Sequence, residues 1–169
     1  MEWKKYNISE LFDIQLSTGD NQANKPLDGK NPLISAGTTN NGICKFIDKP
    51  DLKSQLFNKN VITVDMFGKV YFHNYEFYSV SHGRVNILIP KKEINRYVGV
   101  FIATIIEKRF KGKYNFSRMC SRSRLLKEVI LLPANDTGNP DYVYMEQCIK
   151  AMEQKKIIDY AIFLSEKNK

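Results

Sequence analysis

The chain has no long hydrophobic run and few of the residues that form disulfides or metal sites. No apolar stretch approaches the roughly 18 uninterrupted residues that would predict a membrane-spanning helix. Three cysteines and two histidines are present, and no cysteines form a CxxC pair. We therefore expect reduced thiols in a cytoplasmic protein, with no disulfide framework, no metal and no cofactor. The first residues lack the apolar run of a signal peptide.

Motifs of enzymes that act on DNA are also missing. There is no Gly-rich loop for S-adenosylmethionine and no Asn/Asp-Pro-Pro-aromatic tetrad. Asp141 with Glu153 and Lys155 spells a nuclease-like PD…ExK pattern. In a continuous helix, however, the two carboxylates would lie roughly 18 Å apart, too far to share one metal ion. Cys120 lies among arginines that could lower its thiol pKa, but no base accompanies it. We therefore predict no catalytic residue.

Positive charge is abundant. The 169 residues include 26 Lys and Arg against 18 Asp and Glu, a formal net charge of +8, while the 43% hydrophobic content is ordinary for a folded domain. A surplus of this size favours nucleic acid or an acidic membrane surface as a partner, although a basic soluble protein with no such partner stays possible on charge alone.

The order of patterns predicts an α+β fold. A short turn capped by Ser9 precedes a series of short strands, and Asn41-Gly42, Gly68 and His82-Gly83 mark turns between strands. Helical spacing follows, then a strand, then a long terminal helix that begins near Pro140. The expected strands are 13–16, 32–35, 43–47, two pairs within 60–73 and 77–90, and 128–133, and the expected helices are 93–110 and 140–169.

Four phrases in this order resemble one known family. They are Trp3 with "ISELFDIQLSTG", then "PLISAGTTNNGI", "VITVDMFGKVYFHNYEFYSVSHGRVNILIP" and "LLPANDTGNPDYVYMEQCIKAME". Together they cover nearly the whole chain. They resemble the target-recognition domain of type I restriction-modification specificity subunits.

This resemblance implies a non-catalytic protein that binds double-stranded DNA sequence-specifically. The fold it implies is α+β: a twisted, partly barrel-like mixed sheet with flanking helices, and a long C-terminal helix forming a coiled-coil-like arm. The chain resembles a half-subunit, with a recognition domain at 1–139 and an arm at 140–169. The implied partners are a methyltransferase subunit, through it a restriction subunit, and a second copy or second specificity half docked on the arm.

Basic and short polar side chains are the candidate DNA contacts. Arginine can fork onto guanine, and short amides and hydroxyls can read adenine edges or hold phosphates. Alternatively, the basic groups solvate the surface or pair with Glu107 or Glu128, and the polar hairpin is ordinary turn chemistry. The loop residues Asn21, Gln22 and Lys25 are weaker candidates. The main set is Ser35, Thr38, Thr39, Asn40, Asn41, Arg84, Arg109, Lys111, Lys113, Arg118, Arg122 and Arg124.

The terminal helix carries an apolar seam longer than one domain can cover. Its first turns can pack on the domain, and the remainder needs another helix to cover it. The seam residues are Met145, Ile149, Met152, Ile158, Ala161 and Leu164. The alternative function we retain is an RNA-binding or protein-interaction module that uses the same basic face.

Overall fold

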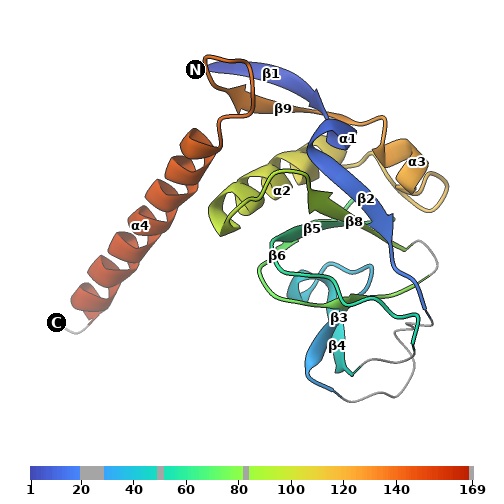
Figure 1. Cartoon of the computed structure of the whole chain (residues 1–169). Coiled ribbons are helices and arrows are strands. Elements are labelled where there is room, and N and C mark those ends of the chain that lie inside the picture. The colour runs from blue at the N-terminus through green and yellow to red at the C-terminus, as the bar shows by residue number, and fades with distance from the viewer. Residues whose placement is uncertain (20–28, 49–51, 82–83, 168–169) are drawn as a thin grey trace.

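A two-stranded ribbon joins the beginning of the chain to its last strand. In the computed structural model, which describes residues 1–19, 29–48, 52–81 and 84–167, strand β1 (Glu2–Asn7) pairs antiparallel with β9 (Val129–Ala134). The sequence predicted β9 but not β1, because residues 2–7 have no buried side chain and become a strand only by pairing with distant β9. A loop of residues 135–141 connects the ribbon to the terminal helix (Figure 1).

A four-stranded antiparallel sheet forms the middle of the domain. Its order is β2-β8-β5-β6, with β2 (Phe12–Leu16), β8 (Val85–Pro90), β5 (Val61–Asp65) and β6 (Val70–His73). The turn predicted at Gly68 between β5 and β6 is confirmed, with a φ of 80° that glycine adopts without strain.

A smaller sheet contains the predicted hairpin of β3 (Asn31–Ile34) and β4 (Ile43–Ile47), joined through a 3-10 turn at Asn40–Gly42. Its third strand, β7 (Tyr78–Ser79), pairs in parallel with β3. The predicted pairing within 77–90 is therefore wrong, because β8 lies between β2 and β5 instead. Apart from β1, the strand pattern indicated where the strands lie, but it does not specify which strands become neighbours.

Two apolar cores hold these layers together. The larger lies between the four-stranded sheet and α2 (Arg96–Phe110), where Val98, Ile102 and Ile106 are buried as the helical spacing predicted. Asn95 caps this helix by accepting the N–H groups of Tyr97 and Val98. The short helix α1 (Ile8–Leu11) follows Asn7 and not Ser9, so the predicted Ser9 cap is wrong.

The second core fills the space between the two larger sheets and encloses a histidine. Phe57, Phe77 and Ile87 belong to this core. His73 is fully buried beside them, with its ring nitrogens hydrogen-bonded to Thr63 at 2.8 Å and Tyr75 at 3.0 Å. Burial lowers the His73 pKa to about 4, so the ring is neutral at pH 7.

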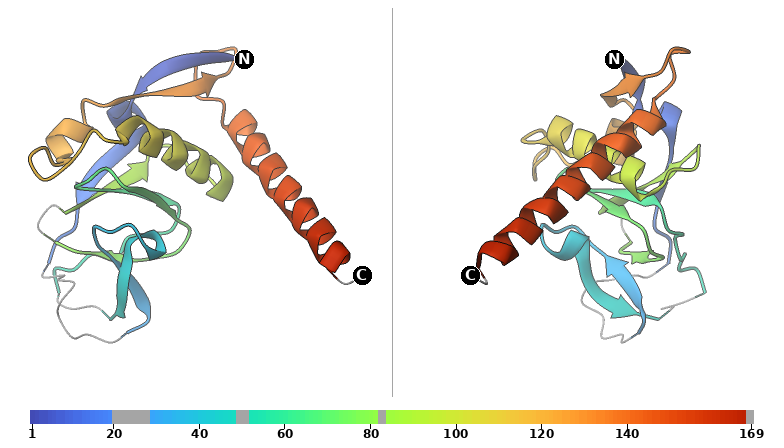
Figure 2. Two further views of the ribbon diagram at one scale, coloured as in Figure 1. Left: turned by 180° about the vertical axis from the view of Figure 1, so that it is seen from behind. Right: turned by 90° about the vertical axis from the view of Figure 1, so that its left-hand side faces the viewer.

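The long helix α4 (Tyr142–Lys167) leaves the ribbon and projects away from the sheets (Figures 1 and 2). Its first turns pack against α2, and Met145 is its only fully buried residue among those described. The predicted α+β fold with a twisted mixed sheet and a long terminal helix is confirmed, although hydrogen bonds divide the described strands into three open sheets. No helix of the described part is both long and apolar enough to cross a membrane.

Candidate functional site

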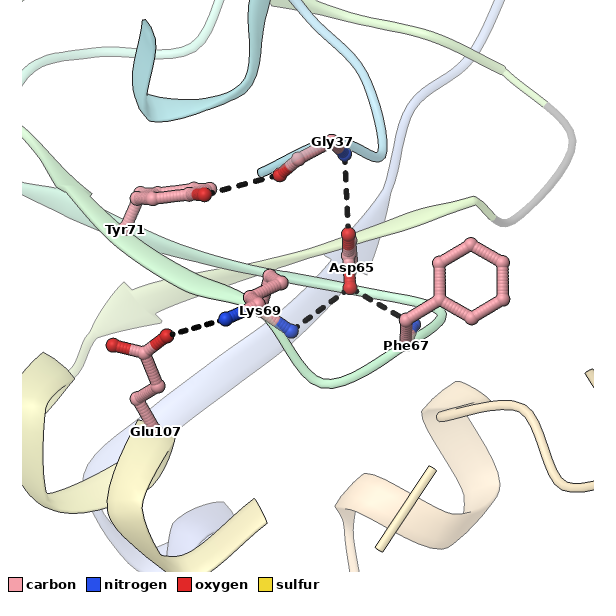
Figure 3. A network of polar contacts seen from close by, with 6 residues as sticks. All are labelled: Gly37, Asp65, Phe67, Lys69, Tyr71 and Glu107. Atoms are coloured by element: carbon pink, nitrogen blue, oxygen red, sulfur yellow. Dashed lines mark hydrogen bonds and ion pairs between the residues drawn. The ribbon is translucent and has the colours of Figure 1, made fainter. Parts of the chain in front are cut away.

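The turn between β5 and β6 is the meeting point of several distant segments. Asp65, at the end of β5, is 4% exposed. Its carboxylate accepts the N–H groups of Phe67 at 2.8 Å, Lys69 at 2.9 Å and Gly37 at 3.2 Å (Figure 3). Burial raises the pKa of Asp65, while these N–H donors act in the opposite direction. Asp65 thus fastens its own turn to the loop between β3 and β4.

That loop is held at its base and open at its tip. The Tyr71 hydroxyl donates to the Gly37 carbonyl at 3.0 Å, and the Ser35 N–H donates to the Gly42 carbonyl at 2.8 Å. Asn40 and Asn41 adopt positive φ angles of 48° and 52°, which asparagine tolerates better than most residues. Ser35 is half-buried in the base, whereas the tip exposes Thr38, Thr39, Asn40 and Asn41.

Two further segments meet at Met66, the next residue of the turn. Its N–H donates to the Arg84 carbonyl at 3.0 Å, and its carbonyl accepts the Cys120 N–H at 2.8 Å. The buried Asn86 amide donates to the Cys120 carbonyl at 2.9 Å and strengthens the same junction. The polar loop, Arg84 and the arginine-rich stretch therefore converge on one turn, although up to about 80 residues separate them in the sequence.

A buried network anchors the arginine-rich stretch. The Tyr114 hydroxyl donates to Glu128 at 2.8 Å, and the Lys113 ammonium pairs with the same carboxylate at 2.5 Å. Burial and the bond to Glu128 raise the Tyr114 pKa. Because Glu128 already neutralises Lys113, we leave this lysine out of the proposed DNA contacts. Cys120 is fully buried and burial raises its thiol pKa to about 12, which contradicts the lowered pKa considered from its arginine neighbours.

The arginines of this stretch are exposed, and two of them donate a hydrogen bond to a backbone carbonyl. Arg122, in the short helix α3 (Arg122–Leu125), donates from Nε to the Ile14 carbonyl at 2.8 Å. Arg124 donates from Nη1 to the Met119 carbonyl at 2.7 Å. A guanidinium has five N–H donors, so each keeps a free edge that can fork onto a phosphate or base.

Arg118 and Arg84 are also exposed. Among the residues that the structure describes, neither they nor the two arginines of α3 form an ion pair.

The remaining candidates lie elsewhere. Arg109 lines a groove between α2 and the β1–β9 ribbon, beside Trp3 and Leu131. Lys111 is exposed in the turn after α2. Glu107 pairs with Lys69 at 3.2 Å and not with one of the candidate residues. The candidates Asn21, Gln22 and Lys25 fall outside the described residues.

Sequence reasoning missed Asp65 and the aromatic pair Phe67 and Phe116. Two of the three N–H groups that Asp65 accepts, those of Phe67 and Lys69, follow from the tendency of aspartate to bond backbone groups just after itself in turns, whereas the bond from Gly37 is a long-range contact. Its position before Met-Phe-Gly could have signalled that role. The ring centroids of Phe67 and Phe116 lie 4.9 Å apart. This contact joins two segments far apart in the sequence, so no local pattern predicts it.

The nuclease-like residues have structural roles. Asp141 accepts the Tyr144 N–H at 3.0 Å at the start of α4, and Glu153 pairs with Arg96 of α2. Within residues 1–19, 29–48, 52–81 and 84–167, no three His, Cys, Asp or Glu side chains are grouped so as to hold a metal ion.

The outer part of α4 is rich in exposed apolar side chains. Of the predicted seam, Met145 is buried and Ile149 is half-buried, while Met152, Ile158, Ala161 and Leu164 are exposed. A cleft of about 300 Å³ runs between α2 and α4 and includes Tyr97, Val100 and Ile149. Further exposed apolar residues on α4 are Val143, Ile157, Tyr160, Ile162 and Phe163.

Comparison with known proteins identifies the class. A model of the family described as "Type I restriction modification DNA specificity domain" matches residues 1–159, so the chain belongs to this family. A curated relative from Heyndrickxia coagulans, "Type II restriction enzyme BgcI specificity subunit S.BcgI", is 29% identical over 160 residues. The alignment covers 93% of this chain and 45% of that relative.

Solved structures support the same fold. The S subunit of a type I restriction-modification system from M. genitalium superposes with a TM-score of 0.61 at 16% identity, covering 97% of this chain and 42% of that one. The HsdS subunit from Thermoanaerobacter tengcongensis gives a TM-score of 0.58 at 12% identity, covering 96% and 39%. The chain spans less than half the length of each of these relatives.

Proposed function

We propose that this chain recognises a short sequence in double-stranded DNA as the specificity component of a type I-like restriction-modification system in the cytoplasm. It reads one half of a bipartite site and has no catalytic role of its own. A methyltransferase subunit and, through it, a restriction subunit supply the chemistry. Membership of the specificity-domain family supports this assignment.

The observation that carries the proposal is the convergence on the β5–β6 turn. The segments that carry a polar loop tip and four exposed arginines, which form no ion pair in the described part, are hydrogen-bonded through Gly37, Arg84 and Cys120 to buried Asp65 or its neighbour Met66. Cations of this kind hold phosphates, and forked guanidinium groups with short amides can read base edges in the major groove. The proposed contacts are Thr38, Thr39, Asn40, Asn41, Arg84, Arg118, Arg122 and Arg124.

We assign different roles to the two parts of the chain. Residues 1–139 form the recognition domain, and residues 140–169 form the arm that docks a second copy, a second specificity half or the methyltransferase. The exposed apolar residues of α4 support this division, since a lone helix that leaves Met152, Ile158 and Phe163 in water gains stability by packing on another helix. The first turn, which buries Met145, also belongs to the domain core.

A competition experiment tests this function against the RNA-binding alternative. The chain is titrated with random duplex DNA and with single-stranded RNA of equal length, each at several salt concentrations. We expect a preference for duplex DNA and an affinity that falls steeply with salt, by a slope of about 0.9 for each phosphate held. Equal or tighter binding to the RNA would replace the proposal with the alternative.

A further inference from the structure

The turn at residues 115–118 presents an aromatic ring to solvent. Phe116 is 81% exposed, the highest value of any aromatic side chain in the described part of the chain. Single exposed apolar residues are common on protein surfaces, so exposure alone assigns no role. The way in which the turn is held and the groups that surround it are more informative.

Two sets of hydrogen bonds, one from a side chain and one between backbones, fix the turn that carries Phe116. The Asn115 side-chain oxygen accepts the N–H groups of Ser117 and Arg118, each at 3.0 Å, and the Ser117 hydroxyl at 2.7 Å. The backbones of Asn115 and Arg118 also exchange hydrogen bonds at 3.2 and 3.1 Å. Phe116 therefore lies at the tip of a preorganised turn, and little conformational freedom remains to be lost when its ring is bound.

The Phe116 ring rests against a second aromatic side chain. Phe67 contacts Phe116 in an edge arrangement with an interplanar angle of 62°. Phe67 also donates its N–H to Asp65, so the aromatic tip belongs to the same assembly as the polar loop and Arg84. The remainder of the Phe116 ring is free to enter another molecule.

The surroundings are basic. Arg118 follows in the same turn, and Arg124 is tied to the neighbouring Met119 carbonyl. Phe116 and the half-buried Phe67 form an apolar pair, much smaller than the core of a stable protein interface. A stiff aromatic tip with cations beside it matches the chemistry of a stacked base step next to its phosphates.

We propose that Phe116 is a wedge that inserts between neighbouring base pairs of the bound duplex, partly unstacks one step and bends the DNA. This inference depends on the proposed function. Burial of the ring and the approach of phosphates to Arg118 and Arg124 offset the lost base stacking. Because pyrimidine–purine steps open most easily, the wedge adds a preference at a step that no hydrogen bond reads.

The test uses the full chain and the duplex that the unmodified chain selects from a random pool. Single bases are replaced by 2-aminopurine, whose fluorescence rises when it is unstacked, and bending is followed by energy transfer between the duplex ends. Phe116→Ala removes the wedge, Phe116→Leu keeps an apolar wedge without an aromatic face, and Phe46→Ala is the control at an exposed ring on β4.

We expect fluorescence to rise at one base step with the unmodified chain, with Phe116→Leu and with Phe46→Ala, but not with Phe116→Ala. Affinity should fall roughly 5- to 150-fold in Phe116→Ala. The inference is overturned if no step responds, if Phe116→Ala retains the response, or if that variant affects only association with a methyltransferase. If the unmodified chain selects no duplex at all, the proposed function itself fails.

Discussion

Arg122 and Arg124 allow charge and geometry to be separated in one experiment. Replacing both by Gln removes two cations from the proposed surface, and replacing both by Lys keeps the charge but removes the planar fork. Each arginine has one N–H on a backbone carbonyl, of Ile14 and Met119 respectively, and a free edge beyond it. The double Gln variant should therefore lose charge-dependent affinity, whereas the double Lys variant should lose only what depends on the planar guanidinium.

The expected magnitudes follow from counterion release. If both arginines hold phosphates, the Gln pair should flatten the slope of log affinity against log salt by about 1.8 and weaken binding roughly 30-fold at 0.15 M salt. The Lys pair should keep the slope. If one arginine forks onto guanine, the Lys pair should lose about 1–3 kcal/mol of discrimination at that base pair.

Folding must be measured beside binding. The Gln pair loses two hydrogen bonds to backbone carbonyls, at about 1 kcal/mol each, so the melting temperature should fall by roughly 2–4 °C per bond. The matched control is the pair Lys155→Gln and Lys156→Gln, which removes the same charge from exposed positions on α4.

Fluorescence anisotropy with the selected duplex, at temperatures where all variants are folded, gives affinity and salt slope together. The reasoning is refuted if the Gln pair binds within twofold of the unmodified chain with the same slope. It is also refuted if the control pair weakens binding as much.

Three further outcomes follow from the structure. Asp65→Asn replaces one acceptor oxygen by a donor, so the free energy of unfolding should fall by about 1–3 kcal/mol. Discrimination between duplexes should fall more than non-specific affinity. The control Asp13→Asn, at the surface, should change neither stability nor discrimination. Since the folded pKa of His73 is about 4 and the unfolded one about 6.5, folding is favoured above pH 6.5 and loses stability as pH falls. Between pH 7 and 5, urea unfolding should show the unmodified chain losing about 2 kcal/mol more than His73→Gln. Ending the chain after Gln154 keeps Met145 buried and removes the outer apolar part of α4. Light scattering should then show lost assembly, while the melting temperature stays unchanged. Intact assembly would contradict the role of the arm.

Local patterns predicted most elements of the fold. Asn41-Gly42 and Gly68 marked two hairpins, since positive φ angles restrict those positions to few residue types. The spacing of Val98, Ile102 and Ile106 marked the buried face of α2. The pairing of strands was not predictable in the same way. Strands β7 and β8 follow each other in sequence, yet β7 pairs with β3 whereas β8 pairs with β2 and β5, because tertiary packing decides the neighbours.

The candidate site shows the same division. The exposed arginines could be found from composition, but Lys113 looked equivalent until its pairing with buried Glu128 was visible. Asp65 was overlooked because its partners include Gly37, whose distance of 28 residues in sequence gives no local signal. Cys120 was misjudged for a related reason: the neighbouring arginines point outward while the thiol lies in the core.

The central claim is that three distant segments form one surface against DNA. A photoreactive phenylalanine analogue placed singly at Asn40, Arg84 and Arg118, and at Lys155 as the control, tests it directly through cross-linking to the selected duplex. The account predicts cross-links from the first three positions to one contiguous site and none from Lys155. Cross-links confined to α4, or an absence of cross-links from all three positions in a chain that still binds, would contradict it.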